Sequence, residues 1–226
     1  MVFHRAHSVA ISSLIAFTAM ASRAEVPVME SVSRNLGHAQ QCLSEGLYAE
    51  AQAYAKTTTF EAPVRVSVQG DPSDVTIEAL EKWSTALGGQ VTFVLASEAE
   101  ANLNISFKHG VRTSGRDIMG LATTRRSVHA WRGGQFSYQV SGSLEIALFT
   151  PGGLPTTRDC LVNTTLHEIG HFLGLDDTMQ RGRVMGPIDL DHPITEPSSE
   201  EALSLTALQR EASVVAEASV NLLAGR

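Results

Sequence analysis

The sequence predicts an α+β domain preceded by a short helical segment. Short runs that alternate apolar and polar residues begin near residue 63 and are typical of strands. Two longer segments with helical periodicity, residues 155–175 and about 200–223, come at the end of the chain. Strands followed by helices, instead of a strict alternation of the two, indicate the α+β class. The 226 residues, 43% of them hydrophobic, suffice for one domain with an appendage.

Residues 1–24 are predicted to be a secretory signal peptide. Arg5 supplies positive charge, and residues 8–21 form a mostly apolar run that is too short to span a bilayer. Small residues at the end of the run allow cleavage after Ala21 or after Ala24, and the boundary is placed at Ala24. The expected product is a secreted protein, extracellular or periplasmic, with no stable membrane anchor.

A helical segment is predicted within residues 25–61. Its pattern around Gly46, Tyr48 and Ala51 is similar to one tetratricopeptide repeat. A single repeat cannot bury its own apolar face, so a helical hairpin packed on the main domain, or a short propeptide, is favoured. The segment offers no ligand to the site described below, and we expect it to be dispensable there.

The two cysteines, Cys42 and Cys160, would meet an oxidising environment after export. One disulfide and two unpaired buried thiols are both compatible with the sequence, because spacing along the chain does not fix the distance between Cα atoms.

The main domain, residues 62–226, is predicted to begin with strands around one helix. That helix follows Asp71 as N-cap, with Pro72 at its first position, and ends at Gly88-Gly89. The last two of the predicted strands form either a hairpin or one long bent strand. The predicted strands are residues 64–69, 90–95, 102–107, 117–123, 135–140 and 143–149.

The two final helices carry clear terminal and core patterns. A capping box is predicted at Ser198–Glu201, at the start of the last helix. The helix before it has an apolar stripe for the core, formed by Val162, Leu166, Ile169 and Leu173.

The charge of the chain argues against a nucleic-acid partner. The formal net charge is −7, and the densest basic feature is the pair Arg125-Arg126.

The segment "HEIGHFLGLDD", residues 167–177, carries the chemistry. On a helix, His167 and His171 are one turn apart and project to one side, with Glu168 beside them. Gly174 can end the helix in a left-handed conformation and return the chain toward the histidines, which brings Asp177 into range as a third ligand. Three protein ligands and an open fourth position are typical of catalytic zinc. Chance produces this pattern, glycines included, in about one chain in ten thousand.

These residues resemble the H-E-x-x-H-x-x-G-x-x-H/D signature of metzincin peptidases, and most closely the matrixins. "RVMGP", residues 183–187, is similar to the methionine turn of that family, with Met185 in the methionine position. The runs at 101–107 and 120–123 resemble its sheet strands, the second being the edge strand along which substrates lie.

The resemblance implies a specific fold and activity. The fold would be a twisted, mostly parallel sheet with an antiparallel edge strand, an active-site helix and a C-terminal helix. The activity would be that of a zinc endopeptidase with one catalytic Zn²⁺ on His167, His171 and Asp177, and with Glu168 as general base. A peptide or protein substrate would bind extended along the edge strand.

Some features depart from the matrixin pattern. Matrixins use histidine as the third ligand, whereas this chain has aspartate, as in snapalysin-type members of the clan. The motif's register selects Asp177 over Asp176. Two alternatives stay open: a catalytically inactive metzincin-like scaffold, and a binding module in which zinc is only structural.

Overall fold

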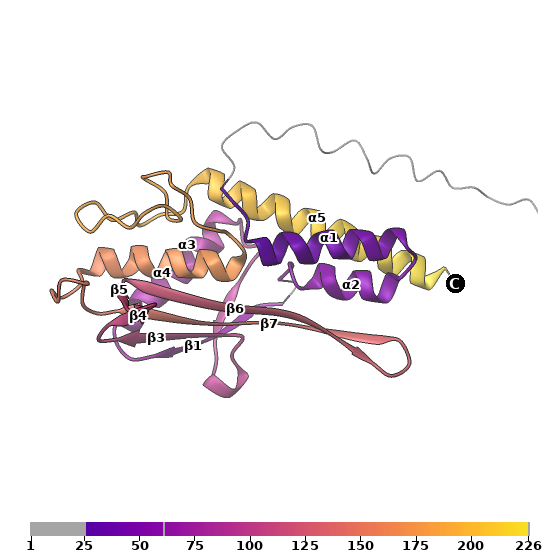
Figure 1. The fold of residues 1–226 in the computed structure, drawn as a ribbon, viewed down its shortest axis with the longest axis horizontal. Coiled ribbons are helices and arrows are strands. Elements are labelled where there is room, and N and C mark those ends of the chain that lie inside the picture. The colour runs from indigo at the N-terminus through magenta and orange to yellow at the C-terminus, as the bar shows by residue number, and fades with distance from the viewer. Residues whose placement is uncertain (1–25, 61, 226) are drawn as a thin grey trace, which may run out of the picture.

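A five-stranded mixed sheet, with the helices gathered on one side of it, organises the chain (Figure 1). The computed structural model describes residues 26–60 and 62–225, so the predicted signal peptide lies outside the described residues. The strand order is β2-β1-β3-β7-β6, parallel except for the antiparallel pair of β6 with β7. The strands are β1 (Val64–Gln69), β2 (Phe93–Leu95), β3 (Leu103–Lys108), β6 (Gly120–Trp131) and β7 (Gln135–Ala147). The predicted α+β class, with a mostly parallel sheet and an antiparallel edge strand, is confirmed.

The C-terminal half of the sheet differs most from the sequence prediction. β7 is one strand of 13 residues and not a hairpin. Gly142, in its middle, permits close packing, because a Cβ there would lie 2.7 Å from the ring of Phe172. Two short strands that the sequence did not predict as a pair, β4 (Val111–Thr113) and β5 (Arg116–Ile118), form a separate antiparallel sheet.

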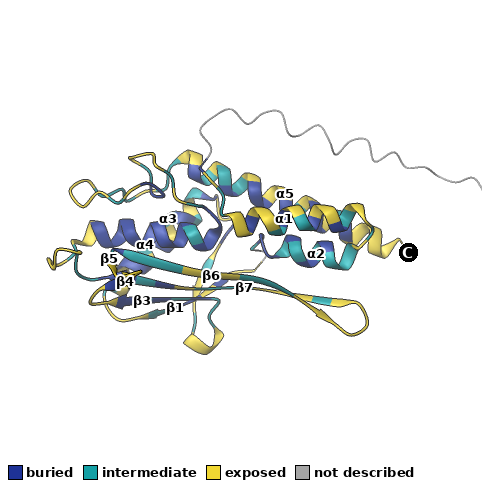
Figure 2. Cartoon of the chain, in the orientation of Figure 1, coloured by how far each residue is buried: buried dark blue, intermediate teal, exposed yellow. Residues whose placement is uncertain are grey.

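β6 continues well beyond its predicted end and pairs with β7 as far as Trp131. The far end of this hairpin projects past the rest of the sheet and is largely exposed (Figure 2). Because both faces of this part of β6 are largely exposed, its sequence shows no apolar alternation from which its length could have been predicted.

Five α-helices complete the described chain, together with the short 3₁₀ helix Glu98–Glu100. The prediction that Asp71 caps α3 is wrong by one residue, because the N-cap is Pro72 and no side chain caps this end. The capping box of α5 is confirmed, with Ser198 and Glu201 bonding each other's backbone. The helices are α1 (Glu30–Ser44), α2 (Tyr48–Lys56), α3 (Ser73–Ala86), α4 (Arg158–Leu173) and α5 (Ser199–Ala224).

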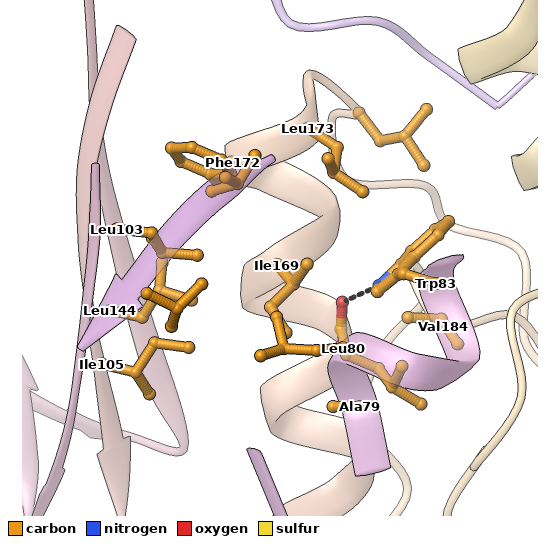
Figure 3. Close-up of a cluster of buried hydrophobic side chains, with 14 of the residues drawn as sticks. Ala79, Leu80, Trp83, Leu103, Ile105, Leu144, Ile169, Phe172, Leu173 and Val184 are labelled. Atoms are coloured by element: carbon orange, nitrogen blue, oxygen red, sulfur yellow. Dashed lines mark hydrogen bonds between the residues drawn. The ribbon is translucent and has the colours of Figure 1, made fainter. Parts of the chain in front are cut away.

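The main core lies between α4 and the sheet, with α3 on the other flank of α4 (Figure 3). The predicted apolar stripe of α4 is buried in this core. The Trp83 indole of α3 donates a hydrogen bond from Nε1 to the Leu166 carbonyl, 2.9 Å away, and so fixes α3 against α4. Nearly every residue of α4 is buried, on the polar side as well as on the apolar stripe (Figure 2).

The helices α1 and α2 form a hairpin that packs against α5 through a second apolar cluster. Cys42 lies in this hairpin and Cys160 in α4, and both are free, buried thiols. The disulfide that the sequence left open is therefore not formed. Cys160 instead donates its thiol to the Leu190 carbonyl at 3.3 Å. Within the described ranges, none of the helices combines the length and apolarity needed to cross a membrane.

Candidate metal centre

Two imidazoles and one carboxylate meet at the C-terminal end of α4. His167 and His171 come from successive turns of this helix, with ring centroids 4.8 Å apart. Asp177 Oδ1 lies 3.1 Å from His167 Nε2 and 3.4 Å from His171 Nε2. The three predicted ligands are thus brought together, with all ligand atoms within 4.8 Å of one another.

The other nitrogen of each imidazole is held by a backbone carbonyl. His167 Nδ1 is 2.7 Å from the Val184 oxygen, and His171 Nδ1 is 2.9 Å from the Leu175 oxygen. Because a carbonyl oxygen only accepts, each Nδ1 carries a proton, and each Nε2 offers its lone pair to a metal when the imidazole is neutral. Two oriented Nε2 atoms and one carboxylate oxygen are a donor set that suits Zn²⁺.

A glycine turn returns Asp177 to the histidines. Gly174 has φ 122°, a conformation that residues with a side chain rarely adopt, and the Leu175 amide bonds back to the Gly170 carbonyl at 3.0 Å. Asp176 does not join the cluster, because its Oδ1 accepts a hydrogen bond from the Asp177 amide at 2.9 Å.

The cluster perturbs the acidity of its members. Hydrogen bonds from His167 and His171 hold the pKa of the Asp177 carboxyl well below its usual range. Burial works against the charged form of His171, but hydrogen bonds to Asp177 and to the Leu175 carbonyl raise its pKa overall. The arrangement therefore favours a negative aspartate facing imidazoles that attract protons or a cation.

Glu168 is buried beside the cluster, with only 4% of its surface exposed. Burial raises the pKa of its carboxyl, while the positive potential of His167 and His171 and a hydrogen bond with the Ala122 backbone oppose that shift. Strand β6 closes over this side chain. A Cβ on Gly120 would lie 2.8 Å from both Glu168 Cγ and Thr164 Cγ2, so only glycine fits at this point of the strand.

Met185 lies directly against α4, as expected for the predicted methionine turn. A Cβ on Gly170 would overlap the Met185 sulfur and lie 3.2 Å from its Cε. The turn is held from the other side by Glu201, whose Oε1 accepts from the Met185 amide and whose Oε2 accepts from the Ser198 amide, each at 2.7 Å. The sequence identified Glu201 only as part of a capping box; its complete burial is the sign of this second role.

The N-terminal segment contacts the loop between Gly174 and Asp177. The sequence did not predict this contact. Val28 and Leu175 form an antiparallel bridge. Beside it, the Met29 amide donates to the Gly174 carbonyl at 2.9 Å, and the Asp176 amide donates to the Pro27 carbonyl at 2.8 Å. The loop that carries the third ligand is therefore anchored on both sides of Leu175.

Arg126 makes a further connection behind the site. Its guanidinium donates to the Phe172 carbonyl, near the end of α4, at 2.6 Å, and also to the Thr57 carbonyl that follows α2. Burial lowers the pKa of this side chain to about 10. The guanidinium connects β6, α4 and the N-terminal segment. Arg126, the second residue of the basic pair in the sequence, therefore has a structural role.

The chain is similar to one known protein family. The matrixin family (Peptidase M10) matches residues 61–195, more than half of the chain. A solved structure described as "Structure of myroilysin" is similar at 14% identity and a TM-score of 0.31, covering 54% of this chain and 53% of that one. The match spans about half the length of that protein. No curated protein matches the sequence significantly.

Proposed function

Because the chain belongs to the matrixin family of zinc metallopeptidases, we propose that it is a secreted endopeptidase whose Zn²⁺ is bound by His167, His171 and Asp177. The observation that carries the proposal is the convergence of two Nε2 atoms and Asp177 Oδ1 beside the buried carboxyl of Glu168. When bound, one zinc ion supplies Lewis-acid activation of water and of the scissile carbonyl.

Glu168 is the general base in this proposal. A buried carboxyl with a raised pKa holds a proton more readily than an exposed one, so it can accept a proton from the attacking water and pass it to the leaving amine. Its position is set by α4 on one side and by the glycine of β6 on the other. The carboxyl therefore has little freedom to leave the position in which it acts.

The substrate is proposed to bind extended along β6. This strand is the edge of the sheet and its first residues, 120–123, run past Glu168, so a peptide paired with its free edge would pass the catalytic carboxyl. Pairing through backbone hydrogen bonds accepts many sequences and excludes folded segments. We therefore expect internal cleavage of unstructured peptides.

Cleavage of an unstructured peptide library by the zinc-reconstituted protein tests the proposal. We expect fragments from internal bonds, with loss of activity on chelation and recovery with Zn²⁺. Cleavage confined to terminal residues would contradict the endopeptidase assignment. Bound zinc that accepts a hydroxamate but supports no cleavage would favour an inactive scaffold, and zinc inaccessible to hydroxamate would favour a binding module.

A further inference from the structure

The α1–α2 hairpin holds a second group of metal-binding side chains, remote in sequence from the catalytic motif. His38 and Cys42 are four residues apart on α1 and thus share one face of that helix. The turn at Gly46, with φ 79°, folds α2 back so that Glu50 faces them. The imidazole nitrogen, the sulfur and the carboxylate oxygen all lie within 4.8 Å of one another.

The distance between the nitrogen and oxygen donors suits a single small cation. Ligand atoms around a tetrahedral zinc ion lie about 3.3–3.8 Å from each other, given bond lengths of about 2.0–2.3 Å. His38 Nε2 and Glu50 Oε1 are already 3.6 Å apart. The rings of His38 and Tyr54 pack edge to face, with centroids 4.3 Å apart, so Tyr54 supports the imidazole within the hairpin.

The charges and the exposure also suit a divalent ion. A thiolate on Cys42 and the carboxylate of Glu50 would together neutralise a charge of +2. The side chains of His38 and Glu50 are 42% and 28% exposed, so an ion can enter from solvent and keep a water as fourth ligand. Cys42 itself is buried, which keeps the sulfur inside the hairpin.

We propose that His38, Cys42 and Glu50 form a second zinc site, with a water as fourth ligand, that clamps α1 to α2. A nitrogen, a sulfur and an oxygen donor on one ion favour zinc over magnesium or calcium, which prefer oxygen ligands alone. The site lies outside the proposed catalytic centre and depends on none of its residues. Its effect would reach the centre indirectly, because Val28 and Met29, just before α1, anchor the loop that carries Asp177.

Cobalt substitution distinguishes the two sites, because only the hairpin site contains sulfur. The full chain, stripped of metal and titrated with Co²⁺, should bind two equivalents and show a thiolate-to-cobalt charge-transfer band in the near ultraviolet. Cys42→Ser should abolish the band and leave one equivalent. Cys160→Ser is the matched control and should keep the band, since that thiol is bonded to the Leu190 carbonyl.

Milder variants keep the test valid if Cys42→Ser does not fold. Glu50→Gln should weaken binding of the Co²⁺ ion that gives the band by at least about tenfold. Glu98→Gln, the same change at a carboxylate of the 3₁₀ helix outside the hairpin, should leave its affinity unchanged. His171→Ala should lower the total to one equivalent and keep the band.

Two results would overturn the second site: a wild-type protein with no thiolate band, or a band that survives Cys42→Ser. Either result would leave the peptidase assignment untouched, because peptide cleavage is measured separately. Conversely, a protein that shows the band but cleaves no peptide would contradict the proposed function and support the hairpin site.

Discussion

Val28 and Leu175 pair across an antiparallel bridge at the turn that follows α4, the helix of the candidate metal ligands His167 and His171. The Leu175 carbonyl is also the acceptor that orients His171. One short contact therefore connects the N-terminal segment to both a ligand and the loop of the third ligand. The sequence predicted that this segment would be dispensable for the metal site, because it contributes no ligand; these contacts lead us to predict the opposite.

Met29→Pro tests this connection with little change in backbone shape. Met29 has φ −53°, close to the value that proline imposes, so the substitution removes the amide that donates to the Gly174 carbonyl and places the proline ring against that oxygen. We expect a loss of more than about 1 kcal/mol in the free energy of unfolding and weaker zinc binding. Met29→Ala, which keeps the amide, controls for the lost side chain. Equal zinc affinity of the two variants, measured by competition with a chelator, would contradict the role of this hydrogen bond.

Gly120→Ala should damage catalysis more than folding. The new methyl group would displace the Glu168 carboxyl, and a misplacement of about 1 Å can cost about a hundredfold in rate. We expect kcat/KM to fall by about that factor, with zinc stoichiometry unchanged. Gly110→Ala serves as the control, because a Cβ there meets nothing within 4 Å. Similar kcat/KM values for the two variants would show that β6 does not position Glu168.

Gly170→Ala should destabilise the protein although alanine favours helices. The helix preference is worth about 1 kcal/mol, whereas overlap with the sulfur of Met185 costs about 1–3 kcal/mol. In a Met185→Ala background the overlap with sulfur is gone and only a close contact with the Trp83 ring, at 3.3 Å, remains, so the same substitution should cost much less. Chemical denaturation of the four proteins of this double-mutant cycle measures the coupling. A coupling near zero would mean that the methionine turn does not pack on α4 as described.

The stability of the zinc-free protein should depend on pH because the pKa values of Asp177 and His171 are shifted. The lowered pKa of Asp177 contributes stability above its unfolded value, about 3.9, and this is lost as the pH falls through the folded value. The raised pKa of His171 contributes stability below its unfolded value, about 6.5, and this is lost as the pH rises through the folded value. Both contributions are therefore complete only between about pH 4 and pH 6.5.

Asp177→Asn should lower the unfolding free energy of the zinc-free protein most within that window. The side chain is 72% exposed, so we expect a loss below about 1 kcal/mol. Asp176→Asn is the matched control, because its carboxylate bonds a backbone amide instead of the histidines. A pH-independent difference for Asp177→Asn, measured by denaturation across this range, would contradict the ion-pair interpretation.

The metal site could be predicted from the sequence because it is local. His167, Glu168, His171, Gly174 and Asp177 lie within eleven residues, so helix geometry and one glycine turn suffice to bring them together. The sheet could be predicted in the same way where one side of a strand is buried, as at β1 and β3.

The parts that the sequence did not reveal depend on contacts between distant segments. Glu201 and Met29 act on the site through backbone groups 16 and 145 positions away along the chain, and no periodicity encodes such pairs. The exposed extension of β6 is fixed by pairing with β7 and not by an apolar pattern. The sequence also did not reveal that the α1–α2 hairpin packs against α5, or that the residues before it pair with the loop that follows α4.

The most direct test of the account compares wild type with Glu168→Gln at equal zinc occupancy. Glutamine has nearly the same shape but cannot accept the proton, and the three ligands are unchanged. We predict one zinc at the catalytic centre of both proteins and a fall in kcat of at least about a hundredfold for the variant. A variant that cleaves peptides at the wild-type rate under saturating zinc would contradict the assignment of Glu168 as the general base.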